Sequence, residues 1–204
     1  MKRIFINLIF QPIRGNMKLG IYPGSFNPVH DGHIKIVKFL LQEGYVNKIL
    51  ILPTPNYWDK QDLIDIKDRI NMLKYYEEKN IIIDDVHNNY PYTYQVLKSL
   101  ELDFPSDYLY LIIGSDNLLT LDKWKNLDKI LKHKIIVMNR GHDNLELEKY
   151  INKLGQEHFI VINKFPFINI SSTMIREGRE EYINPKVLEY IKEHNLYDTY
   201  NKKR

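Results

Sequence analysis

Short, Ile-rich apolar runs alternate along this chain with segments of helical periodicity, and this alternation restricts the fold more than any other feature. Six runs have the length and composition of buried strands: Leu19–Tyr22, Lys48–Leu52, Ile81–Val86, Tyr108–Ile113, Lys134–Met138 and Phe159–Ile162. Residues 49–52 are apolar at every position, as is typical of a parallel strand covered on both faces. The chain is therefore expected to form βαβ units around a parallel sheet.

Between these runs, apolar residues recur every three or four positions, which indicates helices packed on a sheet. The expected helices span His33–Glu43, Leu63–Tyr76, Thr93–Leu102, Asp128–Lys132, Leu145–Leu154, Ser172–Arg176 and Pro185–His194. No repeat, low-complexity tract or linker interrupts the pattern. We therefore predict one α/β domain over residues 17–204, with a Rossmann-like, doubly wound parallel sheet.

The segment from Gly24 to His33, G-S-F-N-P-V-H-D-G-H, joins the first expected strand to the first expected helix. A helix N-terminus carries exposed N–H groups and a positive dipole end, which suit a phosphate group. His30 and His33 are three residues apart and so share one helical face. Gly24 and Ser25 are small enough for backbone amides to approach an anion. The segment predicts a polyphosphate site without a P-loop, since no G-x-x-x-x-G-K-[ST] run exists.

The fourth expected strand leads into Gly114-Ser115-Asp116, which supplies a small residue and a carboxylate at a strand end. A strand order of 3-2-1-4-5 would make strands 1 and 4 neighbours, at the point where ligands bind doubly wound sheets. Both motifs would then face one crevice. Trp124 follows eight residues after Asp116 and is either a packing aromatic or a platform for a ligand ring.

A third polar segment, Ile170-Ser171-Ser172-Thr173-Met174-Ile175-Arg176, begins another helix with three hydroxyls and places an arginine one turn later. Taken alone, this pattern is more often an ordinary N-cap followed by a solvent-exposed arginine. Beside the two strand-end motifs it also fits an anion site, because hydroxyls, N–H groups and a permanent cation combine there.

Composition excludes several classes of protein. The chain has 204 residues, enough for one well-buried domain, and no cysteine, which rules out disulfides, thiolate metal sites and a cysteine nucleophile. Its 29 basic and 26 acidic residues give a net charge of +3 with no basic stripe, so we expect no nucleic-acid partner.

Residues 1–16 contain a seven-residue apolar run, Ile4–Phe10, behind two basic residues. The run is far too short to span a membrane, and no small-x-small cleavage site follows it. We therefore expect an N-terminal extension rather than a targeting signal, and a cytoplasmic protein with no membrane partner. The sequence does not determine the oligomeric state, and a homo-oligomer is one of the possible states.

His30-Asp31-Gly32-His33, after a strand and before a helix, resembles the (H/T)-x-G-H signature of the nucleotidyltransferase superfamily. With G-S-D, K-W, Asn139-Arg140 and I-S-S-T-x-I-R in the same order, the stretch from about Met17 to Tyr197 resembles the nicotinate/nicotinamide mononucleotide adenylyltransferases. The resemblance implies a reaction of ATP with a pyridine mononucleotide, giving a dinucleotide and pyrophosphate. It also implies Mg²⁺ bound through phosphates rather than by a protein carboxylate cage.

The same resemblance assigns residues to roles. It implies that His30, His33 and Arg176 are catalytic by stabilising charge on the phosphates. The implied ATP site comprises Gly24, Ser25, Phe26, His30, His33, Gly114, Asp116, Arg140, Ser172, Thr173 and Arg176. The implied pyridine mononucleotide site comprises Ser25, Phe26, Lys60, Tyr92, Thr93, Asp116 and Trp124, with Trp124 stacked on the pyridine.

We expect the nicotinate form of the mononucleotide to be preferred, because the Tyr92-Thr93 segment with Trp124 resembles the acid-preferring branch. Two enzymatic alternatives remain: preference for nicotinamide mononucleotide, or a different acceptor such as phosphopantetheine. A nucleotide-binding or chaperone-like protein without catalysis is a further alternative. Against it stands the presence of His30, His33 and Arg176 together.

Overall fold

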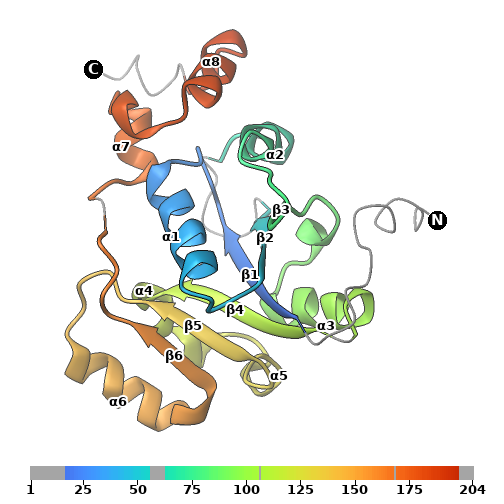
Figure 1. The fold of residues 1–204 in the computed structure, drawn as a ribbon, viewed down its shortest axis with the longest axis vertical. Coiled ribbons are helices and arrows are strands. Elements are labelled where there is room, and N and C mark those ends of the chain that lie inside the picture. Colours follow the sequence, from blue (N-terminus) through green and yellow to red (C-terminus); the bar gives the residue numbers. More distant parts are fainter. Residues whose placement is uncertain (1–16, 56–62, 106, 168, 198–204) are drawn as a thin grey trace.

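The computed structural model describes residues 17–55, 63–105, 107–167 and 169–197. Its centre is a six-stranded sheet in the order β3-β2-β1-β4-β5-β6, parallel throughout (Figure 1). The strands are β1 (Lys18–Gly24), β2 (Lys48–Pro53), β3 (Ile81–Ile83), β4 (Tyr108–Gly114), β5 (Lys134–Met138) and β6 (Phe159–Ile162). The expected α/β class and the central pairing of the first and fourth strands are confirmed.

Helices connect successive strands and continue after the last one. They are α1 (Asp31–Gln42), α2 (Ile66–Lys74), α3 (Thr93–Asp103), α4 (Ser115–Leu118), α5 (Leu127–Ile130), α6 (Asn144–Leu154), α7 (Ser172–Arg176) and α8 (Pro185–Glu193). Short 3₁₀ turns are η2 (His87–Asn89), η3 (Leu121–Lys123), η4 (Gln156–His158) and η5 (Glu180–Tyr182). All seven helices predicted from periodicity are present, with ends shifted by a few residues.

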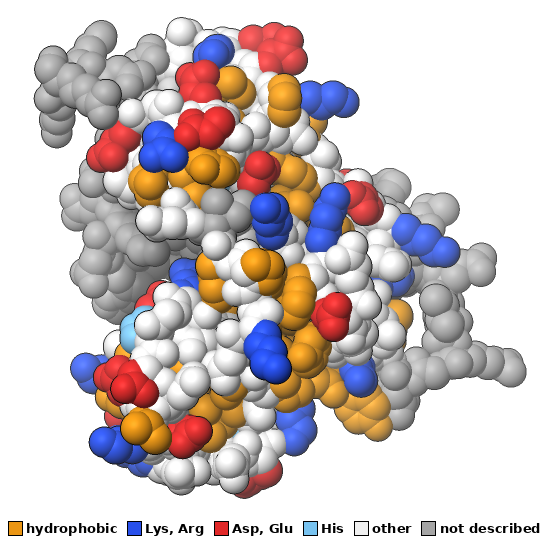
Figure 2. All heavy atoms as spheres, turned by 60° about the vertical axis from the view of Figure 1, so that its left-hand side comes forward, with side chains coloured by type: hydrophobic (Ala, Val, Ile, Leu, Met, Phe, Trp, Pro, Cys, Tyr) orange, Lys and Arg blue, Asp and Glu red, His pale blue; other side chains and the backbone are white. Residues whose placement is uncertain are grey.

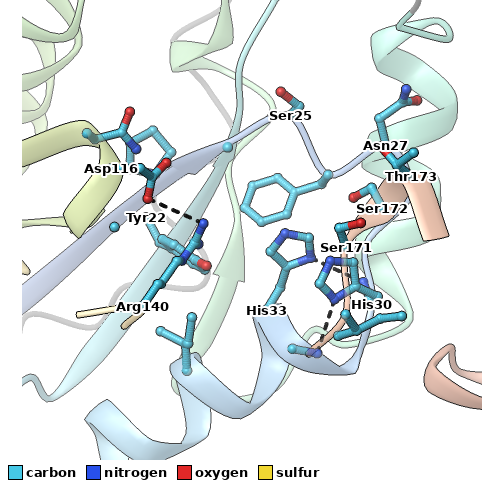
Figure 3. Close-up of a pocket in the computed structure, with 18 of the residues that line it drawn as sticks. Tyr22, Ser25, Asn27, His30, His33, Asp116, Arg140, Ser171, Ser172 and Thr173 are labelled. Atoms are coloured by element: carbon cyan, nitrogen blue, oxygen red, sulfur yellow. Dashed lines mark hydrogen bonds and ion pairs between the residues drawn. The ribbon is translucent and has the colours of Figure 1, made fainter. Parts of the chain in front are cut away.

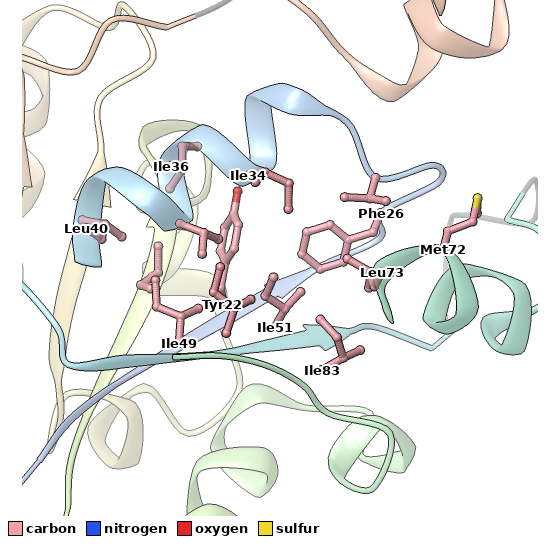
Figure 4. Packing of buried hydrophobic residues seen from close by; sticks show 14 of the residues in the cluster. Tyr22, Phe26, Ile34, Ile36, Leu40, Ile49, Ile51, Met72, Leu73 and Ile83 are labelled. Atoms are coloured by element: carbon pink, nitrogen blue, oxygen red, sulfur yellow. The ribbon is translucent and has the colours of Figure 1, made fainter. Parts of the chain in front are cut away.

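The sheet separates two hydrophobic cores, because consecutive side chains of a strand point to opposite faces. In β2, Ile49 and Ile51 pack with α1, α2 and α8, whereas Leu50 and Leu52 pack with α3 on the other face. Figure 4 shows the first core, where side chains of α1 meet those of β1, β2 and β3. Burial on both faces explains why these strands are apolar throughout.

The third strand ends earlier than predicted, at Ile83 rather than Val86. The cause is Asp84, whose Oδ1 accepts hydrogen bonds from the backbone N–H groups of Val86 (2.8 Å) and His87 (3.0 Å). A carboxylate that binds the backbone two and three residues ahead turns the chain out of the extended conformation. Apolar composition alone does not report this turn.

Charges of both signs are mixed on one face of the molecule. On the face drawn in Figure 2, acidic and basic side chains are interspersed, in keeping with the near balance of charges in the sequence. Within the described residues, no helix is long and apolar enough to cross a membrane.

Candidate active site

The two histidines of the H-x-G-H motif shape the beginning of α1. His30 is the N-cap residue, and its Nδ1 accepts a hydrogen bond of 3.1 Å from the N–H of Gly32. The N–H of His30 in turn donates to Nδ1 of His33 at 3.2 Å. Because each Nδ1 accepts a hydrogen bond, the proton of each neutral ring lies on Nε2. The helix therefore begins with two imidazoles in the tautomer that offers Nε2–H as a donor.

Burial keeps both rings uncharged at neutral pH. It lowers the pKa of His30 to about 4, and the positive charge of Arg140 acts in the same direction. The pKa of His33 lies well below its ordinary value, because of burial first and then of the neighbouring charges of His30 and Arg140. The rings stack with centroids 3.7 Å apart, so two adjacent positive charges would repel each other. They can act as neutral hydrogen-bond donors before any anion arrives.

Gly32 is a glycine for a steric reason. A Cβ at this position would lie 3.0 Å from the ring of His30 and 3.0 Å from a methyl carbon of Ile170. Both approaches are tighter than ordinary van der Waals contact, so either α1 or the loop before α7 would have to shift. The glycine between Asp31 and His33 therefore lets the segment before α7 pack closely against His30.

The loop between β1 and α1 carries Phe26 with a positive φ of 47°, an unusual conformation for a residue other than glycine. The Phe26 ring is buried and packs edge-on against Tyr22 and His33, with centroids 5.6 and 5.0 Å away. A Cβ at Gly24 would come within 2.9 Å of the same ring. The glycine thus allows the aromatic ring to fold beneath the loop and support the backbone that faces the cleft.

An arginine that sequence reasoning missed holds this loop from below. Arg69 of α2 is fully buried, and its guanidinium donates to the carbonyl oxygens of Ser25 (2.7 Å), Thr54 (2.8 Å) and Ile64 (3.2 Å). A buried charge is tolerated only with several hydrogen-bond partners. The signal was present in the sequence, since Arg69 interrupts the apolar face of the expected helix at 63–76.

The predicted I-S-S-T-x-I-R segment reaches the same loop from α7. Ser172 Oγ donates to the carbonyl oxygen of Pro28 at 2.8 Å. Arg176 donates to the carbonyl oxygen of Asn27 at 2.6 Å and to Thr173 Oγ1 at 3.1 Å. These contacts bring together segments almost 150 residues apart. The hydroxyl and guanidinium groups predicted to form an anion site therefore lie beside the histidines.

The ends of β4 and β5 form the other side of the cleft (Figure 3). Arg140 Nη1 lies 3.6 Å from Asp116 Oδ1, and the charge of Arg140 also acts on the Tyr22 hydroxyl. Burial raises the pKa of that hydroxyl to about 12, although Arg140 favours its ionised form. A Cβ at Gly114 would collide with the Asp116 carboxylate and lie 3.2 Å from the guanidinium. Gly114 therefore leaves the space that this ion pair occupies.

These elements enclose a cleft of about 870 Å³ at the carboxyl ends of β1 and β4. Eleven predicted site residues line it: Gly24, Ser25, Phe26, His30, His33, Gly114, Asp116, Arg140, Ser172, Thr173 and Arg176. Sequence reasoning did not single out Tyr22, Asn27, Asn117 or Phe167, which line it as well. The convergence follows from the strand order, which makes the ends of β1 and β4 neighbours.

Three residues predicted for a pyridine ring lie outside this lining. Trp124 is partly buried against the core beneath α3, and Tyr92 and Thr93 are half-buried at the beginning of α3. Lys125 Nζ lies 4.4 Å from the centroid of the Tyr92 ring, which places the two segments side by side. Lys60 falls outside the described residues.

Comparison with known proteins gives the chain a family. Residues 21–178 match the family model described as cytidylyltransferase-like. A probable nicotinate-nucleotide adenylyltransferase of Flavobacterium psychrophilum is 35% identical, over 89% of this chain and 99% of the relative. One of Borrelia hermsii is 36% identical, over 89% of this chain and 98% of the relative.

Solved structures agree with these relatives. The nicotinic acid mononucleotide adenylyltransferase of Plasmodium falciparum, solved in complex with APC, is 26% identical and superposes with a TM-score of 0.71. The alignment covers 90% of this chain and 98% of that protein. The same enzyme in complex with NaAD superposes with a TM-score of 0.73, which supports the fold. The chain therefore belongs to the cytidylyltransferase-like family and, within it, to the nicotinate-nucleotide adenylyltransferases.

Proposed function

We propose that this chain transfers the adenylyl group of ATP to nicotinate mononucleotide, giving nicotinate adenine dinucleotide and pyrophosphate, in a cytoplasmic step of NAD biosynthesis. The observation that carries the proposal is the convergence of His30, His33, Arg140 and Arg176 on one cleft at the carboxyl ends of β1 and β4. Two neutral donors and two permanent cations are suited to a polyphosphate, and the relatives of the chain carry the name of this activity.

In the proposed reaction, an oxygen of the mononucleotide phosphate attacks the α-phosphorus of ATP in line. The new phosphorus–oxygen bond forms as the bond to the β-phosphate breaks, and pyrophosphate leaves with that electron pair. The attacking oxygen is already ionised, so no general base is required of His30 or His33. Catalysis of this kind rests on holding two anions in line and neutralising their charge.

The tautomer of His30 and His33 determines what these residues can do in the reaction. Their Nε2–H groups are oriented by backbone hydrogen bonds to each Nδ1, so little reorganisation is needed when a phosphate arrives. An anion beside the rings also raises their pKa values, opposing the effect of burial. Each imidazole can then strengthen its hydrogen bond as negative charge develops on the transferred phosphate.

The donor set of the cleft fits Mg²⁺ that arrives with ATP. Among the described residues lining it, Asp116 is the one carboxylate, and no cluster of three His, Cys, Asp or Glu that could hold a metal is found. Mg²⁺ commonly keeps several waters and binds through one or two carboxylates and substrate phosphates. Bound through the phosphates, the ion would supply charge neutralisation, and Asp116 is the carboxylate of the described lining that could help to hold it.

For the pyridine, we propose that Tyr92, Thr93 and Trp124 form the recognition segment beyond the cleft. A nicotinate carboxylate requires donors, which backbone N–H groups and Thr93 Oγ1 can offer. The amide would direct its own N–H groups at those donors and leave groups unpaired. Such a mismatch costs about 1–3 kcal/mol, or roughly 5–150-fold in kcat/KM. Lys60, whose placement lies outside the described residues, is proposed to face the mononucleotide phosphate.

The test is pyrophosphate release at fixed ATP and Mg²⁺ with nicotinate mononucleotide, nicotinamide mononucleotide and phosphopantetheine in parallel. We expect the highest kcat/KM with nicotinate mononucleotide. Equal values for the two pyridines, or a preference for the amide, would contradict the acid preference alone. Turnover of phosphopantetheine only would change the acceptor, and ATP binding without turnover of any acceptor would leave a nucleotide-binding protein.

Trp124→Ala tests the stacking role in the same assay. We expect it to raise KM for both pyridine mononucleotides alike, by roughly tenfold, because stacking does not distinguish a carboxylate from an amide. A change confined to the ratio between acid and amide would show that Trp124 contacts the carboxyl group instead of the ring.

A further inference from the structure

Ser115 and His142 form a hydrogen-bonded pair directly behind the cleft. Ser115 is fully buried, and its Oγ lies 2.7 Å from Nδ1 of His142. The backbone N–H of Arg140 donates to the same Oγ at 3.0 Å. A serine hydroxyl has one proton and two acceptor lone pairs, so Oγ accepts from Arg140 and also shares a hydrogen bond with Nδ1 of His142, as donor or as acceptor according to the tautomer of the ring. The chain of hydrogen bonds runs from Arg140 through Ser115 to His142.

The loop that carries Arg140 is tied down on its other side by Asn139. Asn139 Oδ1 accepts from the N–H groups of Gly141 (3.1 Å) and His142 (2.9 Å). Its Nδ2 lies within hydrogen-bond distance of the His142 carbonyl oxygen and of Asn163 Oδ1, at 3.1 and 3.0 Å. The loop is thus closed on itself and joined to β6. The contact with Ser115 joins it to the beginning of α4.

The first two residues of α4 therefore contact both the backbone and the side chain of Arg140. Ser115 accepts from its backbone N–H, and Asp116 lies 3.6 Å from its guanidinium. Arg140 and Asp116 line the cleft, whereas Ser115 and His142 lie behind it. Loss of the Ser115 contact would leave the loop held through Asn139, while the Arg140 side chain would keep its half-exposed carboxylate partner, which is a weak restraint in water.

We propose that Ser115 and His142 are positioning residues that hold Arg140 in place for the ATP phosphates. This inference rests on the proposed function to the extent that Arg140 contacts ATP. A guanidinium binds phosphate strongly only when its donors point at the phosphate oxygens. Displacement of the loop that carries Arg140 therefore weakens the contact. The pair acts through Arg140 and touches no substrate itself.

The experiment measures KM for ATP, kcat, the affinity for Mg·ATP by calorimetry, and the melting temperature. Ser115→Ala and His142→Ala should each raise KM for ATP by roughly threefold to tenfold, the scale of one hydrogen bond, and leave kcat within about threefold. His142→Asn is the matched variant, because its side-chain amide can accept or donate in place of Nδ1. It should return KM to within about twofold of the wild type.

The decisive comparison is made in an Arg140→Ala background, where no guanidinium remains to be positioned. There Ser115→Ala should leave KM for ATP unchanged, since two residues acting through one contact are not additive. The same increase in both backgrounds would overturn the inference, as would an unchanged KM in folded Ser115→Ala or His142→Asn behaving like His142→Ala. A wild-type chain that transfers no adenylyl group would contradict the proposed function instead, and Mg·ATP affinities would still decide the positioning role.

Discussion

The hydroxyl of Tyr197 donates a hydrogen bond of 2.9 Å to Oδ1 of Asn27, across 170 positions of sequence. Both side chains are buried, and Asn27 lines the cleft. The same Oδ1 accepts from the N–H of Ile64, and the carbonyl of Asn27 accepts from Arg176. The loop before α1 is therefore held by groups from three distant segments, one of them following α8.

The contact predicts the effect of Tyr197→Phe, which removes the hydroxyl and keeps the ring. A buried hydrogen bond contributes about 1 kcal/mol, so the melting temperature should fall by roughly 2–4 °C for a chain of this size. The exposed Tyr75→Phe is the matched control and should shift it by less than about 1 °C. Equal shifts in thermal unfolding of the two variants would show that the hydroxyl contributes nothing.

His33→Ala is predicted to lower kcat by roughly 10²–10³-fold, the scale for loss of one donor to developing charge. The variant should still fold, with a melting temperature lowered by the loss of one capping hydrogen bond and of the ring contacts with His30 and Phe26. The readout is pyrophosphate release together with thermal unfolding, with His158→Ala, far along the chain near β6, as the control. A folded His33→Ala variant with kcat near that of the wild type would exclude the catalytic role.

Acid should destabilise the chain through His30. Its pKa is about 4 when folded and about 6.5 when unfolded, so the unfolded chain binds more protons between these values. This contribution to stability is present above about pH 6.5 and is lost as the pH falls toward 4, on the order of 2–3 kcal/mol in total. His30→Asn keeps an N-cap acceptor without a titrating group, so its urea-unfolding free energy should vary less over that range. An unchanged pH slope would contradict the assignment.

His87 should act in the opposite direction. It lies between Asp84 (2.7 Å) and Asp103 (3.0 Å), and hydrogen bonds to these carboxylates raise its pKa despite burial. A raised pKa gives stability that is complete below the unfolded value and is lost as the pH rises through the folded one. The wild-type chain should therefore lose unfolding free energy as the pH rises from neutral to alkaline. The His87→Asn variant should not show this decrease. If urea unfolding of the two chains has the same pH dependence there, the ring is not charged in the native state.

A shortened chain beginning at Met17 is predicted to keep its activity and to melt within about 2 °C of the full chain. Pairing of the sheet begins at this residue, where the carbonyl of Met17 accepts from Tyr108 N–H at 2.8 Å and its N–H donates to Asp107 at 3.2 Å. Residues 1–16 lie outside the described residues, and the proposal treats them as dispensable. A large fall in either measurement would give them a structural or catalytic role.

Local pattern was sufficient for the elements and for much of the cleft. The strands at 134–138 and 159–162 and the helix at 172–176 have the boundaries that apolar periodicity indicates. The H-x-G-H motif lies at the beginning of α1, as predicted, because the end of β1 and the start of α1 are close in sequence. β3 ends before the predicted strand does, because Asp84 accepts hydrogen bonds from N–H groups that composition does not reveal.

Alternation of apolar runs and helical periods by itself determined a parallel α/β sheet, because each element depends on residues within a few positions of one another. Only the tertiary structure decided which distant groups meet. Arg69 beneath the loop, Tyr197 on Asn27 and the Ser115–His142 pair behind Arg140 join segments up to 170 positions apart. Such contacts depend on strand order and on the complementary burial of donors and acceptors, which arise only when the chain is closed around its two cores.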